Sequence, residues 1–143
     1  FAMLPFCGYN MGDYLAHWLK MGLQQGAIHP KFYYVNWFRK GHDGQFLWPG
    51  FGDNARVLKW IFERCDGKGK AQETPIGMLP EASAIDITGL ELSDKTMDEL
   101  LTVNKEEWLG DLPGIRSFYD SFEGNVPQNL IEKLSWLEAR LKK

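Results

Sequence analysis

The chain has few of the residues that form covalent or metal cross-links. Only two cysteines occur in its 143 residues, Cys7 and Cys65, and they do not form a CxxC pair. We expect each to be a buried free thiol, and without a signal-peptide pattern this favours a reducing, cytoplasmic setting. The three histidines lie far apart, and none has a partner at metal-ligand spacing, so we expect no metal site.

Long apolar runs and charge of one sign are also scarce. No run is long enough to span a bilayer, so we expect no membrane partner. The net charge is −3 without a basic block, which argues against nucleic acid. The chain is 44% hydrophobic and 14% aromatic, enough to form the core of one domain. It opens at Phe1 inside an apolar run without a methionine, so we expect a piece of a longer protein.

Periodicity and turn residues predict an α+β fold, mainly helical, with a few short strands and a hairpin. We expect a first helix over residues 13–24, stopped by Gly26, and an interior strand over 31–38 that is apolar on both faces. A turn at 41–44 would return the chain as a short strand over 46–48. A second helix would begin at Asp53 or Asn54 and end at Gly67. Its expected apolar face is Leu58, Ile61, Phe62 and Cys65.

The second half of the chain is predicted to be mostly helical. The prolines of TPIGMLP indicate a short extended segment docked on something else. Asn104 with Glu107 resembles a capping box, and a break or kink is expected at Gly110 and at Pro113-Gly114. Pro127 opens a last helix whose leucines at 130, 134, 137 and 141 indicate a packing seam more than a separate coiled coil.

Aromatic residues concentrate between Asn36 and Arg56. Filling the core is the usual role of aromatic side chains. Against that role, Gly50 and Gly52 bracket Phe51, which places this ring on a bare turn. Asn54 follows at an expected helix N-terminus, where free N–H groups favour acceptors. Stacking rings beside one amide suit a planar heterocycle, but these physical arguments alone leave a base-binding site and plain core equally supported.

The segments NWFRK, FLWPGFGDNAR and ETPIGMLP follow PFCGYNMGDYLAHWL in this order. Together they closely resemble the C-terminal part of GTP-dependent phosphoenolpyruvate carboxykinase, over nearly the whole chain and most strongly over residues 5–80. The resemblance implies that residues 1–143 are the C-terminal, guanine-nucleotide-binding portion of this enzyme. The missing N-terminal and catalytic parts of the same enzyme would then be the partners of the chain.

The resemblance also implies roles for single residues. Phe38 and Phe51 would hold the guanine between their rings, and Phe46 would lie at its edge. Asn54 would recognise the base together with the backbone of Phe51, Gly52 and Asp53. Trp37 and Trp48 would flank the site, as wall or as core. Arg39, Lys40 and Arg56 could meet phosphate, but charges beside a turn are usually solvated.

The implied reaction converts oxaloacetate and GTP to phosphoenolpyruvate, CO2 and GDP, a lyase reaction of gluconeogenesis or anaplerosis. It implies GTP or GDP and a divalent cation, Mn2+ or Mg2+, whose ligands are not expected in this chain. No GxxxxGK[ST] motif occurs in the sequence. We therefore expect no catalytic residue here and no activity of the chain alone. The alternative is a stand-alone aromatic platform that binds a sugar or a proline-rich peptide.

Overall fold

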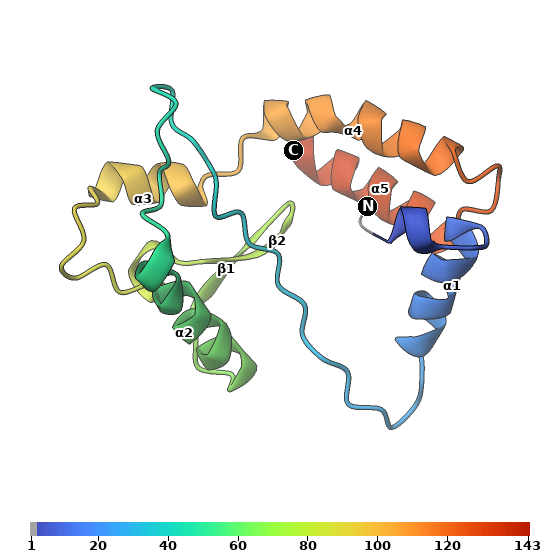
Figure 1. Ribbon diagram of the computed structural model, residues 1–143, viewed down its shortest axis with the longest axis horizontal. Helices are drawn as coiled ribbons and strands as arrows, with labels where there is room; N and C mark the ends of the chain where they lie inside the picture. Colours follow the sequence, from blue (N-terminus) through green and yellow to red (C-terminus); the bar gives the residue numbers. More distant parts are fainter. Residues whose placement is uncertain (1–2) are drawn as a thin grey trace. The chain divides into compact units, whose positions relative to one another are not determined.

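The computed structural model describes residues 3–143, which belong to two compact units (Figure 1). One unit combines the described residues up to Pro30 with Asn104–Lys143, and the other comprises Lys31–Val103. Helices are the main secondary structure of the chain, and the described residues form one two-stranded antiparallel sheet. The α+β prediction is confirmed. No helix in the described part is long and apolar enough to cross a membrane.

The first unit begins with a 3-10 turn, Leu4–Phe6, and helix α1, Met11–Met21. The helix starts earlier than predicted because Asn10 caps it, with its side-chain oxygen 2.8 Å from the Gly12 nitrogen, and it ends earlier, with Gly22 as its C-cap. The Asn10 amide also donates to the Phe122 carbonyl at 3.0 Å. A Cβ at Gly12 would lie 2.0 Å from the Asn125 carbonyl oxygen, so only glycine allows this close approach.

Helix α4, Lys105–Asp120, runs without interruption through Pro113, so it has no break where a break or kink was predicted. Asn104 caps it as expected, accepting from the N–H groups of Glu106 and Glu107. A proline inside a helix costs about 3 kcal/mol. Burial of Leu112, 3% exposed, on the turn beside the proline helps to offset that cost.

Helix α5, Gln128–Leu141, lies along α4 (Figure 1). Pro127 is its N-cap. Leu134 and Leu141 are buried, which confirms the predicted packing seam. At the surface, Glu138 pairs with Arg116 of α4 and with Lys142, so charges reinforce the contact between the two helices.

The second unit contains a 3-10 turn, Phe51–Asp53, followed by helix α2, Asn54–Cys65. Strands β1, Ala71–Thr74, and β2, Gly77–Pro80, form a hairpin in which Ala71 pairs with Pro80. A 3-10 turn, Ala82–Ala84, and helix α3, Asp94–Leu101, complete the unit. Its buried core consists of Trp48, Trp60, Ile85 and Met97.

The face that α2 buries differs from the predicted one. Trp60 is buried, and Val57 and Ile61 pack against the same core, whereas Leu58 and Phe62 are 46% and 69% exposed. Both faces carry apolar residues at helical spacing, so periodicity alone did not separate them. The Trp60 indole N–H donates to the carbonyl of Lys70, the residue just before β1, at 2.9 Å. Cys65 is therefore exposed, and its prediction as a buried thiol is wrong.

Two strand predictions are also corrected. Residues 31–38 are not a strand: the bridge between Lys40 and Phe46 is the one isolated pairing in the described part. The predicted hairpin is thus reduced to this bridge around the turn at 41–44. Lys31 instead donates to the carbonyls of Arg64 and Cys65, at the end of α2. TPIGMLP, expected to be an extended segment docked on something else, instead turns back at Pro75 and Ile76, so that its residues 77–80 pair with residues 71–74.

Candidate functional site

The turn before α2 displays Phe51 to solvent in a strained conformation. Gly50 has φ 76° and Phe51 has φ 49°, and the Phe51 side chain is 95% exposed. A left-handed backbone costs an L-residue about 1–2 kcal/mol. Burying a phenylalanine would stabilise the fold by about 1.5–3 kcal/mol, and the exposed Phe51 ring does not provide this stabilisation. Folding alone does not explain such a residue, and strain of this kind concentrates where ligands bind.

Backbone donors accompany the exposed ring. The Asp53 N–H donates to the Gly50 carbonyl at 3.1 Å, closing the 3-10 turn. Within the described residues, the N–H groups of Phe51 and Gly52 have no acceptor, as is usual for the first groups of a helix. The positive end of the α2 dipole lies at the same place. The turn can therefore donate hydrogen bonds to acceptor atoms of a ligand that lies on Phe51.

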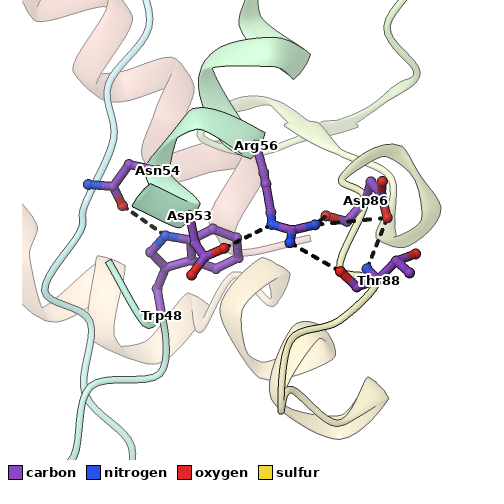
Figure 2. A network of polar contacts seen from close by, with 6 residues as sticks. All are labelled: Trp48, Asp53, Asn54, Arg56, Asp86 and Thr88. Atoms are coloured by element: carbon purple, nitrogen blue, oxygen red, sulfur yellow. Dashed lines mark hydrogen bonds and ion pairs between the residues drawn. The ribbon is translucent and has the colours of Figure 1, made fainter. Parts of the chain in front are cut away.

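Asn54, the first residue of α2, is held by Trp48. Its side-chain oxygen accepts from the Trp48 indole N–H at 2.9 Å (Figure 2). Trp48 is only 5% exposed and belongs to the core, so it is not an open wall of the site. Trp37, also predicted to flank the site, is half-buried against the same core.

Phe38 and Phe46 form the second aromatic element. Their ring centroids are 5.9 Å apart at 59°, and both rings remain largely exposed, at 71% and 56%. The bridge between Lys40 and Phe46 brings them together, and the Lys40 ammonium lies 5.2 Å from the Phe46 ring centroid. The structure thus brings together two of the three predicted phenylalanines, while Phe51 makes no ring contact within the described residues.

Arg56 lies at the centre of a polar network (Figure 2). Its guanidinium donates to the Asp53 carboxylate at 3.0 Å and to the carbonyls of Asp86 and Thr88 at 2.7 and 3.1 Å. Arg39 is likewise directed at the carbonyls of Leu100 and Thr102. Both arginines, considered as phosphate ligands from sequence, hold loops instead.

Asp86 and Thr88 were missed by the sequence analysis. The Thr88 N–H donates to the Asp86 carboxylate at 2.9 Å. Hydrogen bonds from Thr88 lower the pKa of Asp86, and the nearby Arg56 adds to the effect. An Asp followed by Thr two residues later is an Asx-turn signal that could have been found. Its partner Arg56 lies too far away in sequence to be inferred.

No group of three or more His, Cys, Asp or Glu residues in the described part could hold a metal ion, so the described residues do not fit a divalent-cation site. A groove of about 250 Å³ lies along α2, lined by Arg56, Lys59, Trp60, Glu63, Ser83, Ala84 and Asp86. None of these residues was predicted to bind the base.

The fold and its exposed rings define an α+β protein with a candidate site for a planar ligand. Residues 1–140 match the family model described as the phosphoenolpyruvate carboxykinase C-terminal P-loop domain. The chain belongs to this family.

Three curated relatives named phosphoenolpyruvate carboxykinase [GTP] illustrate the similarity. The chain is 50% identical to the protein of Treponema pallidum over 143 residues. It is 51% identical to that of Neocallimastix frontalis over 144 residues and 47% identical to that of an Arthrobacter species over 141. Each alignment covers 98–99% of this chain but only 23–24% of the relative. The chain therefore spans about a quarter of the length of these relatives.

Proposed function

We propose that residues 1–143 are the guanine-nucleotide-binding portion of an enzyme that converts oxaloacetate and GTP to phosphoenolpyruvate, CO2 and GDP. Family membership supports the reaction, and the names of the relatives support GTP as the nucleotide. The chain would select the nucleotide, while other parts of the enzyme would supply the chemistry, the phosphate-binding loop and the Mn2+ or Mg2+ ligands. The chain alone would then be inactive. A cytoplasmic role in gluconeogenesis or anaplerosis is part of the same proposal.

The exposed, left-handed Phe51 carries the proposal. A ring that is 95% exposed at φ 49° has its face open to a stacking partner. In the proposed complex the guanine lies between Phe51 and Phe38, with Phe46 at its edge. Phe46 already lies beside Phe38, so one wall of such a site exists before a ligand binds.

Polar groups next to Phe51 would supply selectivity. The N–H groups of Phe51 and Gly52 and the Asn54 amide lie on one short turn, and Trp48 holds the oxygen of that amide. A stacking face next to fixed donors suits a base that carries acceptors at its edge. Asp53 would contribute through its backbone, because its carboxylate is bonded to Arg56. Trp37 would support the Phe38 wall from the core side.

The proposal is tested by titrating the chain with GDP and following tryptophan fluorescence, with Phe51→Ala as the variant. Each base–ring contact is worth roughly 1–3 kcal/mol, so the loss of one ring should weaken binding about 5- to 150-fold. Because the phosphates would lack most of their partners, we expect weak binding by the wild-type chain. The variant should show no guanine-dependent signal in the same range.

Phe32→Ala is the matched control. Phe32 lies in the same unit and is also exposed, at 85%, but belongs to no predicted contact. It should bind GDP like the wild type. An unchanged titration of Phe51→Ala would show that the ring does not contact the base. Tight binding of a sugar or a proline-rich peptide, with no response to guanine nucleotides, would favour the alternative, which the family match does not support.

A further inference from the structure

We propose that Trp48 is a positioning residue that turns the Asn54 side chain so that its NH2 group faces the base. This orientation selects purines with a carbonyl at C6. The inference rests on the proposed function and adds to it a residue that does not touch the ligand. It follows from the direction of one hydrogen bond and from the rigidity of both of its ends.

The direction of the hydrogen bond fixes the amide. An indole N–H can only donate, so its partner atom on Asn54 must be the oxygen. The two atoms are 2.9 Å apart. The Asn54 nitrogen consequently points away from the indole (Figure 2). Rotating the amide by half a turn would oppose an N–H with an N–H, which leaves a donor unpaired in a half-buried place.

Both ends of this hydrogen bond are anchored. Trp48 is 5% exposed and packed against Trp60, Ile85 and Met97, so its indole has no room to rotate. Asn54 is the first residue of α2, so the helix holds its backbone in place. The Asn54 nitrogen has no acceptor within the described residues, and the neighbouring Asp53 carboxylate is already bonded to Arg56. The free donor is therefore held in one direction before any ligand arrives.

A fixed donor distinguishes purines by the group at C6. Guanine and hypoxanthine carry a carbonyl oxygen there, which accepts a hydrogen bond. Adenine carries an amino group, so two donors would face each other and both would lose their bonds to water. Without the Trp48 N–H the amide could rotate and offer either atom. The preference for a C6 carbonyl should then fall, while stacking on Phe51 remains.

The test compares the affinities of GDP, IDP and ADP for the whole chain, measured by 1H–15N spectra of the labelled protein. Trp48→Phe keeps an aromatic ring in the core but removes the donor. Trp60→Phe is the matched control, since Trp60 is also 5% exposed and also loses an indole bond, that to Lys70 at 2.9 Å. We expect Trp48→Phe to lower the ratios of GDP and IDP affinity to ADP affinity about tenfold. Trp60→Phe should leave both ratios unchanged.

Several outcomes would overturn the inference. If Trp48→Phe keeps the wild-type ratio of GDP to ADP, or weakens all three nucleotides alike as Trp60→Phe does, then Trp48 is only structural. If GDP loses affinity but IDP does not, the donor does not recognise C6. A wild-type chain that binds guanine and adenine nucleotides equally, or neither, contradicts the proposed function itself, and the inference fails with it.

A second variant keeps the test decisive if Trp48→Phe does not fold. Asn54→Asp retains an oxygen for the Trp48 N–H but replaces the outward NH2 with an acceptor. Asn54 is the first residue of α2, where the helix dipole favours a negative charge, so this change should be mild for the fold. We expect GDP and IDP to lose at least tenfold relative to ADP. An unchanged GDP preference in this variant would refute the orientation of the amide.

Discussion

Replacing Phe51 should leave the free protein as stable as before, or more stable. The Phe51 ring is 95% exposed, so Phe51→Ala removes almost no packing, and we expect a change within about 0.5 kcal/mol. Phe51→Gly also relieves the left-handed backbone at φ 49°, worth about 1–2 kcal/mol. The greater freedom of glycine in the unfolded chain lowers the free energy of unfolding by about 0.5–1 kcal/mol. The net effect should be a gain of about 0.5–1 kcal/mol.

The measurement is thermal and urea unfolding followed by circular dichroism. A gain of this size corresponds to a rise in Tm of up to about 4–8 °C for a unit of this size. Met97→Ala serves as the reference, because Met97 is 3% exposed in the core of the same unit. It should lose about 2–5 kcal/mol.

Two results would refute this reasoning. If Phe51→Ala lowers the free energy of unfolding by more than about 1 kcal/mol, the ring is packed and not displayed. If Phe51→Gly is less stable than Phe51→Ala, the residue does not adopt the left-handed conformation. The expected pattern, stability kept and guanine binding lost, would mark Phe51 as a residue maintained for a ligand.

Two further perturbations test the rest of the fold. Pro113→Ala should raise stability by about 1–3 kcal/mol in thermal unfolding, because alanine restores a backbone donor inside α4; a loss would mean that the helix needs the proline. Asp86 has a lowered pKa in the folded chain, so its contribution to stability is present above the ordinary aspartate pKa of about 4 and is lost as the pH falls through the folded pKa. Asp86→Asn should therefore flatten the acid limb of a stability–pH curve, and an unchanged limb would contradict the role of its bonds with Thr88.

The sequence predicted helices more reliably than strands. Helices α1, α2, α4 and α5 carry local signals, such as the caps Asn10 and Asn104, and each was found within a few residues. Strands depend on partners that no local pattern names. Residues 31–38 have the β-branched and aromatic residues of a strand but no pairing partner in the described part, and TPIGMLP has a partner that was not recognised.

The sequence also did not predict which residues tertiary packing would bury. Both sides of α2 carry apolar residues, and the core chose Val57, Trp60 and Ile61. A break or kink was expected at Pro113 because its local cost was weighed without the burial of Leu112. Tertiary contacts decided both cases. The roles of Arg39 and Arg56 were hidden for the same reason, since their acceptors lie far away in sequence.

The candidate site shows why residue type alone does not separate a ligand-facing aromatic residue from a core residue. Trp48 and Phe51 are close in sequence, yet one is 5% exposed and the other 95%. The chain direction changes between them at Gly50, whose φ of 76° turns the following residue outward. A tryptophan also needs a partner for its N–H, which Asn54 supplies from inside. In the proposed site, the buried Trp48 ring orients the Asn54 amide, and the exposed Phe51 ring offers a face for stacking. One aromatic residue thus contributes because it is buried, and the other because it is exposed.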